Sequence, residues 1–308
     1  MRLGIDIGGS KIAAALIDES GSIIQQIRRP SDRSADSKQF ISLLFETVNT
    51  LCPKRSQISF CGVGYPGSIS RQGHIISSPN LPMLIGLPLK NELEKLLSVA
   101  VAVDNDANCA ALAELKFGAL QNAGQAILLT LGTGIGGGII CNGELYRGVS
   151  GTAGEVGHMI IHPNGRPCSC GNKGCWEKYA SAKALTALLR KQAMADPNSI
   201  LWQIACGNIK NIGAHCTEAA LKKDDQAAVK ALEEYLEELS TGISNLCCLF
   251  DPQIIAIGGG LSALYPYFAQ KLQTLVKQKV YSGDAWQGKL IKARFGNNAG
   301  LIGAAFLS

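Results

Sequence analysis

One histidine and three cysteines lie close together near the middle of this 308-residue chain, at His158, Cys168, Cys170 and Cys175. Thiolate and imidazole side chains in a set of four are typical ligands of tetrahedral zinc, and Gly171 and Gly174 supply turns between them. Four protein ligands leave no open position on the metal, so the pattern predicts a structural zinc. The alternative interpretation is three free thiols beside a hydrogen-bonded histidine. The carboxylates of Glu155 and Glu177 bracket the set and indicate a polar site next to the metal.

Two aspartates stand where a predicted strand is followed by a predicted helix. Residues 99–103 are apolar, Asp104 and Asp106 follow on either side of Asn105, and strong helix formers come next. Because α/β proteins place ligand-facing groups at the carboxyl ends of strands, Asp106 is a candidate general base toward a hydroxyl group. The alternative is that the two aspartates are helix caps, although one helix needs only one cap.

Three glycine-rich segments could bring backbone N–H groups close to a phosphate, namely residues 8–9, 132–138 and 258–260. Residues 132–137 match G-x-G-x-x-G, but a dinucleotide-binding fold needs a helix directly after these glycines. Residues 139–143 instead indicate a strand and a hairpin turn, which disfavours an NAD-dependent oxidoreductase. The first segment ends in Gly-Ser-Lys and lacks the spacing of a Walker phosphate loop.

A pattern of strand, glycine turn, strand and hairpin occurs twice, starting at residues 3 and 126. Two such units can face each other across a cleft, each presenting a phosphate-binding loop. Asp6 lies at the first turn and could hold Mg²⁺ or its water shell. Phosphoryl transfer needs positioned phosphates, such a cation and a base, and the chain offers candidates for all three. The alternative role of Asp6 is to cap the turn.

Strands alternate with helices along the chain, which predicts an α/β fold, and the length favours two domains. Apolar spacing predicts strands over residues 3–7, 12–17, 22–27, 58–64, 99–103, 126–131, 139–141, 253–257 and 289–294. The same reasoning predicts helices over residues 37–51, 89–97, 176–195, 224–250, 262–280 and 298–307.

Composition excludes several functional classes. The formal net charge of +5 is modest and the basic residues form no run, so we expect no nucleic-acid partner. No apolar stretch is long enough to span a membrane and the first residues lack a signal-peptide core, so we expect a cytoplasmic protein. We therefore interpret the 11 cysteines as reduced thiols and metal ligands. His74, His162 and His215 have mixed surroundings, and we predict no role for them.

Several of these motifs together resemble the ROK family of repressors, open reading frames and kinases. Residues 6–11 are similar to its D-x-G-G-[TS]-K turn, residues 131–158 to its glycine-rich signature, residues 168–175 to its zinc motif and residues 105–108 to its catalytic segment. The resemblance implies an α/β, two-domain actin-like ATPase (ribonuclease H-like) fold with an inserted zinc-binding loop over residues 154–177. The implied domains are residues 1–107 with 296–308, and residues 108–295.

The resemblance also implies phosphorylation of a hexose with ATP, Mg²⁺ and a structural Zn²⁺. Asp106 would be the general base, and sugar hydroxyls would bind Asn80, Asn105, Asp106, Glu155, His158 and Glu177. His158 would use one ring nitrogen for zinc and the other for sugar. ATP and Mg²⁺ would bind Asp6, Gly8, Gly9, Ser10, Lys11, Gly132, Thr133, Gly134, Gly258, Gly259 and Gly260. Ser10 keeps the hydroxyl of the commoner threonine, and a homodimer is the expected assembly.

The motifs leave the substrate open. Residues 174–181 resemble glucokinases of the family, which favours glucose, whereas residues 104–109 are closer to its N-acetylglucosamine kinases. N-acetylmannosamine and fructose are further alternatives, and polyphosphate is an alternative phosphoryl donor. A repressor with an N-terminal DNA-binding domain is disfavoured, because the first phosphate-binding strand is expected to start at residue 3 and Asp106 is intact. A non-catalytic sugar-sensing regulator is the remaining competing hypothesis.

Overall fold

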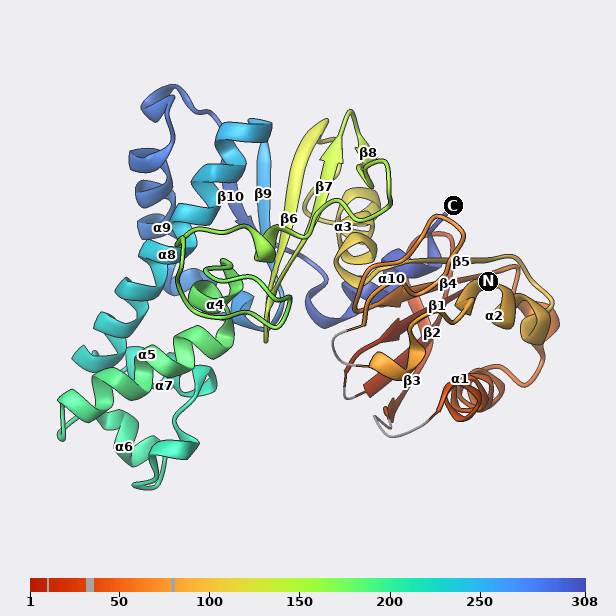
Figure 1. Cartoon of the computed structure of the whole chain (residues 1–308), viewed down its shortest axis with the longest axis horizontal. Coiled ribbons are helices and arrows are strands. Elements are labelled where there is room, and N and C mark those ends of the chain that lie inside the picture. Colours follow the sequence, from red (N-terminus) through yellow and green to blue (C-terminus); the bar gives the residue numbers. More distant parts are fainter. Residues whose placement is uncertain (10, 32–35, 79–80) are drawn as a thin grey trace. The chain divides into compact units, whose positions relative to one another are not determined.

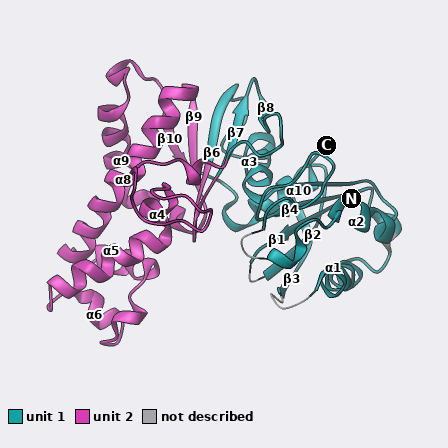
Figure 2. Cartoon of the chain, viewed as in Figure 1, with its two compact units in different colours: residues 1–128, 137–154, 293–308 teal, residues 129–136, 155–292 magenta. Residues whose placement is uncertain are grey.

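The computed structural model describes residues 1–9, 11–31, 36–78 and 81–308 of the chain (Figure 1). These residues form two compact units (Figure 2). Unit 1 contains Met1–Leu128, Gly137–Gly154 and Ala293–Ser308. Unit 2 contains Leu129–Gly136 and Glu155–Lys292. Both units therefore combine segments that are far apart in the sequence. The functional domain division at residues 107/108 and 295/296 stays a prediction.

Unit 1 is built on a five-stranded sheet with the order β3-β2-β1-β4-β5. Its strands are β1 (Arg2–Ile7), β2 (Lys11–Ile17), β3 (Ile23–Pro30), β4 (Phe60–Tyr65) and β5 (Val101–Asn105). The first three strands form an antiparallel meander, whereas β4 runs parallel to both β1 and β5. Because β1, β4 and β5 are parallel, their carboxyl ends lie at one edge of the sheet, where Asp6 and Asp104 are found.

The described residues of unit 1 form the α-helices α1 (Ser37–Leu51), α2 (Leu89–Leu97), α3 (Asp106–Phe117) and α10 (Ala299–Ala305). The C-terminal helix α10 packs on α3, β1 and β4. This packing depends on glycine, because a Cβ at Gly303 would overlap the carbonyl group of Cys109, and one at Gly62 would overlap that of Ala304. The resulting core contains fully buried apolar side chains from the sheet and from α1, such as Ile5, Leu44 and Val63.

A second five-stranded sheet has the order β10-β9-β6-β7-β8. Its strands are β6 (Gln125–Leu131), β7 (Ile135–Cys141), β8 (Glu144–Leu145), β9 (Ile254–Gly258) and β10 (Lys289–Lys292). The helices of unit 2 are α4 (Glu177–Ala180), α5 (Ala182–Ala195), α6 (Ile200–Ile204), α7 (Thr217–Leu221), α8 (Gln226–Phe250) and α9 (Tyr265–Lys279). The long helix α8 packs against α5 and α9, and its apolar face is buried as its periodicity predicts.

The structure corrects two of the predicted helices. The predicted helix over 176–195 is two helices, because Ser181 has an extended backbone and its hydroxyl caps α5 by accepting a hydrogen bond from the N–H of Ala184. The predicted helix over 262–280 begins as a 3-10 turn at Gly260–Leu264 and becomes α-helical only at Tyr265.

Among the residues with a described structure, no helix has the length and apolar character needed to cross a membrane.

Candidate functional site

The four predicted zinc ligands come together in unit 2. Their ligand atoms all lie within 4.8 Å of one another. Cys168 Sγ is 3.7 Å from His158 Nδ1, and Cys170 Sγ is 3.6 Å from Cys175 Sγ. A zinc tetrahedron with metal–sulfur bonds of 2.3 Å has edges of about 3.8 Å, so these separations fit a Zn²⁺ ion. The predicted Cys₃His cluster is therefore confirmed as a geometric arrangement.

The chain forms this cluster through a tight loop whose turns require glycine. Gly171 and Gly174 have φ angles of +93° and +83°, in the left-handed region that side chains disfavour. Backbone hydrogen bonds close the loop, from the N–H of Cys168 to the carbonyl of Asn172 (2.9 Å) and from Gly174 to Arg166 (2.8 Å). Burial raises the pKa of the Cys175 thiol to about 12, so metal binding must displace its proton.

Two carboxylates accompany the zinc cluster. Glu177 begins α4, and its Oε1 accepts a hydrogen bond of 3.4 Å from Cys168 Sγ. Glu155 precedes the 3-10 turn Val156–His158 and is exposed to solvent. Desolvation by its surroundings nevertheless raises the pKa of Glu155, while His158 lowers it and Glu177 raises it. These three side chains thus share one electrostatic environment, in which acceptors for hydroxyl groups stand beside a metal-binding loop.

The long helix α8 anchors the zinc loop. Glu238 Oε2 lies 2.7 Å from His162 Nε2, and the Glu238 carbonyl accepts a hydrogen bond of 2.9 Å from the indole of Trp176. Trp176 is fully buried, and a Cβ at Gly242 would overlap its ring. The ring of Tyr179 packs against that of His162 at an interplanar angle of 54°, with centroids 4.4 Å apart. His162 therefore has a structural partner, which was not predicted from the sequence.

Unit 2 also brings two of the glycine-rich segments close to each other. The turn at Gly132–Gly134 joins β6 to β7 and is closed by a hydrogen bond of 3.0 Å from the Gly132 N–H to the Gly134 carbonyl. A strand follows it, so the helix required by a dinucleotide-binding fold is absent here and the oxidoreductase alternative is eliminated. Gly259, at the end of β9, has a φ of +75°, and a Cβ there would overlap the backbone of Leu131.

In unit 1, Asp106 is the first residue of α3 and directly follows β5. Asn105 is the N-cap residue, because its Oδ1 accepts hydrogen bonds from the N–H groups of Ala107 (2.8 Å) and Asn108 (3.2 Å). The cap role considered for Asp104 and Asp106 therefore belongs to Asn105. Asp106 Oδ1 also accepts a hydrogen bond from Ala107, at 2.8 Å. A capped helix start thus carries the Asp106 carboxylate.

Three carboxylates of unit 1 gather around one buried thiol. Burial raises the pKa of Cys109 on α3 well above its usual range, and the negative charges of Asp104, Asp6 and Asp106 raise it further. Asp6 is in β1, and the turn after it is closed by a hydrogen bond of 2.8 Å from the Gly8 N–H to the Lys11 carbonyl. Asp6 pairs with Gly64 of β4, and a Cβ built at Gly64 would lie 3.6 Å from the Cα of Asp106, so the fold brings Asp6 and Asp106 close to each other although they are far apart in the sequence.

Burial raises the pKa of Asp6 to about 6, whereas Lys11 and Arg28 lower it. Since the folded pKa exceeds the unfolded value, this carboxyl stabilises the fold at low pH, and that contribution is lost as pH rises from 3.8 to about 6. We expect Asp6→Asn to change the free energy of unfolding of the unliganded protein more favourably at pH 8 than at pH 4, by roughly 1–3 kcal/mol. Urea unfolding of both proteins at the two pH values measures this difference.

A second aspartate of unit 1, Asp18, provides the control for that measurement. A hydrogen bond from the Ser20 hydroxyl lowers the pKa of Asp18, so its stabilising contribution is present at neutral pH and lost in acid. We therefore expect Asp18→Asn to show the opposite pH dependence. Equal effects of Asp6→Asn at pH 4 and pH 8 would contradict a raised pKa of Asp6.

Two predicted site residues, Asn80 and Ser10, lie outside the described residues. Lys11 begins β2 and is exposed, while Gly8 and Gly9 precede it in the turn. The assignment of individual residues to sugar, ATP and Mg²⁺ stays a prediction.

The ROK family model matches residues 2–308. The chain belongs to the ROK family. The two-sheet α/β architecture is that of ROK sugar kinases and places the chain in the actin-like ATPase fold class, which confirms the predicted fold. The Cys₃His cluster lies in the predicted inserted loop.

ROK proteins with different functions are similar to this chain. A glucokinase of Streptomyces coelicolor is 34% identical, with 100% of this chain and 97% of that protein covered. The structure of a ROK family glucokinase from Streptomyces griseus in complex with glucose and AMPPNP matches with a TM-score of 0.89 at 32% identity, covering 100% of this chain and 98% of that one. A xylose repressor of Bacillus subtilis is 32% identical, with 98% of this chain and 75% of the repressor covered.

Sequence reasoning missed one pair of functional interest in this ROK protein. Arg147 Nε donates a hydrogen bond of 2.6 Å to Asp104 Oδ2, and Asn108 Nδ2 donates one of 2.8 Å to Asp104 Oδ1. Asp104 lies in β5 and Asn108 in the first turn of α3, so the second bond spans the junction between the strand and the helix. Nothing in the sequence pattern links Arg147 to Asp104.

Proposed function

We propose that the chain is an ATP-dependent hexose kinase that transfers a phosphoryl group to the 6-hydroxyl of glucose. One observation carries this proposal. The chain matches, over its full length, a ROK glucokinase crystallised with glucose and AMPPNP. The catalytic residue of the proposal is Asp106, whose place at the start of α3 supports it.

In the proposed mechanism, Asp106 accepts the proton of the attacking 6-hydroxyl as the oxygen approaches the phosphorus. Asn105 and Asn80 bind neighbouring hydroxyls. Glu155 and Glu177 accept hydrogen bonds from the others, and their charge complements several hydroxyl donors at once. His158 directs Nδ1 toward Cys168, which leaves Nε2 for a sugar hydroxyl. These groups orient the sugar, so the reacting oxygen is the one nearest Asp106.

The phosphates of ATP are assigned to the glycine turns of both units. The turns at residues 8–11 and 132–134 would bind them through the N–H groups that do not close those turns, together with the Lys11 ammonium, and Gly258–Gly260 would lie next to the adenosine. The carboxylate of Asp6 is the type of hard oxygen ligand that Mg²⁺ prefers, directly or through water. Bound there, Mg²⁺ would neutralise charge on the transferring phosphoryl group.

Zinc belongs to the proposal as a structural ion. Four ligands at tetrahedral spacing leave no position for a reacting water, so its contribution is to hold the loop between Glu155 and Glu177. The division into two functional domains, the homodimer and the cytoplasmic location are parts of the same proposal. So is the expectation that the protein has no nucleic-acid partner.

A panel of sugars and phosphoryl donors tests the proposed reaction. We expect ADP release with glucose and ATP to exceed that with N-acetylglucosamine, N-acetylmannosamine or fructose, measured in a coupled assay. A higher kcat/KM with an N-acetylhexosamine would make that sugar the substrate and would still support a sugar kinase. Binding of a sugar without turnover of any donor, polyphosphate included, would instead support the sugar-sensing regulator.

A further inference from the structure

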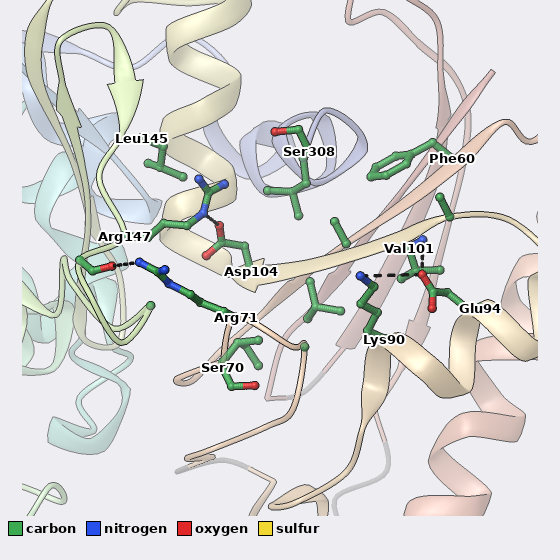
Figure 3. A pocket seen from close by; sticks show the side chains of 18 of the residues that line it. Phe60, Ser70, Arg71, Lys90, Glu94, Val101, Asp104, Leu145, Arg147 and Ser308 are labelled. Atoms are coloured by element: carbon green, nitrogen blue, oxygen red, sulfur yellow. Dashed lines mark hydrogen bonds and ion pairs between the residues drawn. The ribbon is translucent and has the colours of Figure 1, made fainter.

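The carboxylate of Asp104 is buried beside the segment that carries Asp106. Its side chain is 8% exposed, and its Oδ2 lies 2.6 Å from Arg147 Nε (Figure 3). A buried carboxylate is costly without an opposite charge or several donors. The surroundings of Asp104 supply both, because Arg147 provides the charge at one oxygen and two N–H donors reach the other.

These two donors both come from the start of α3. Asp104 Oδ1 accepts hydrogen bonds from the N–H of Asn105 (2.7 Å) and from Asn108 Nδ2 (2.8 Å). Asn105 in turn caps α3 through the N–H groups of Ala107 and Asn108. A chain of hydrogen bonds therefore runs from Arg147 through Asp104 to the residues on both sides of Asp106.

Arg147 has a second arginine, Arg71, as a neighbour along the same cavity. It lies in the loop after β8, beside a cavity of about 720 Å³ that is also lined by Asp104 and Arg71 (Figure 3). Arg71 Nη2 donates a hydrogen bond of 2.9 Å to the carbonyl of Gly148. The Arg147 side chain remains 37% exposed, so substitution there opens no buried apolar core. Its main contact with a buried group is the ion pair with the Asp104 carboxylate.

We propose that Arg147 and Asp104 are a positioning pair that fixes Asn105 and Asp106 for catalysis. The effect on rate rests on the proposed function, in which Asp106 is the general base. Since an error of about 1 Å in the placement of reacting groups can lower a rate by about 10²-fold, the pair acts on kcat. ATP contacts are assigned to other loops, so the KM for ATP is unaffected.

The kinetic test compares Arg147→Met with Arg147→Lys and Arg71→Met. We expect Arg147→Met to lower kcat by about 10- to 100-fold with the KM for ATP changed less than threefold. Arg147→Lys keeps the charge and should recover part of the loss. Arg71→Met removes a neighbouring arginine and its bond to Gly148, but it leaves Asp104 paired, so its kcat should stay within threefold of wild type. Full kcat in Arg147→Met would overturn the pair's role in catalysis.

Amide hydrogen exchange tests the pair without any activity measurement. The N–H groups of Asn105, Ala107 and Asn108 are all bonded within this network. We expect faster exchange at these three amides in Arg147→Met, with no change in Arg71→Met. Unchanged exchange in both variants would overturn the proposal. If the wild-type protein phosphorylates no sugar, the proposed function fails, and the exchange rates alone decide whether Arg147 holds this segment.

Discussion

Asp106→Asn is expected to lower kcat for sugar phosphorylation by about 10²–10⁴-fold, the usual contribution of a general base. The asparagine side chain has nearly the same shape and keeps an oxygen that can accept the hydrogen bond from Ala107. It has no basicity toward a hydroxyl proton. Because Asn105 caps α3, the helix does not depend on the charge of Asp106. The measurement is ADP release at saturating sugar and ATP, accompanied by the thermal midpoint and the zinc content.

A matched control is available at the start of another helix of unit 1. Asp36 caps α1 through the N–H of Gln39, and asparagine caps helices equally well. Asp36→Asn should therefore leave kcat unchanged. Undiminished turnover in Asp106→Asn would rule out this residue as the base. A lower rate accompanied by a large fall in the thermal midpoint would instead indicate a structural role.

Periodicity in the sequence was sufficient to predict the long elements. The helix predicted over 224–250 is α8 at Gln226–Phe250, and the strand predicted over 126–131 is β6 at Gln125–Leu131. Residues 198–223 carry no sustained period, and their short helices α6 and α7 were not predicted. Such helices depend on capping and tertiary packing more than on an amphipathic pattern.

Some features of the candidate site have local signals in the sequence, whereas others depend on contacts between distant positions. The zinc ligands were predicted because ligand type and spacing are contained in one loop, and Asp106 because it follows a strand and begins a helix. The contact of His162 with Glu238 and that of Arg147 with Asp104 join positions 76 and 43 residues apart. Nothing in a single sequence marks such partners, because each pairing depends on the completed fold.

Loss of the cluster's metal is expected to raise the sugar KM at least tenfold. The loop that carries Cys168 contacts Glu177, and His158 and Glu155 stand at its other end. Without the ion, these groups lose their fixed positions. A single hydrogen bond to a charged group contributes about 1.5–3 kcal/mol, and 1.4 kcal/mol is a factor of ten in affinity. The kcat at saturating sugar should fall less, because Asp106 belongs to the other unit.

Cys170→Ser removes one ligand with little cost in packing, since Cys170 is exposed. We expect metal analysis to find about one zinc per chain in the wild-type protein and much less in this variant. Cys248→Ser, at another exposed cysteine, should keep both the zinc and the sugar KM. Full zinc in Cys170→Ser would refute the Cys₃His set. Loss of zinc with an unchanged sugar KM would show that the metal has no effect on sugar binding. Other contacts would then have to hold Glu155 and Glu177 in place.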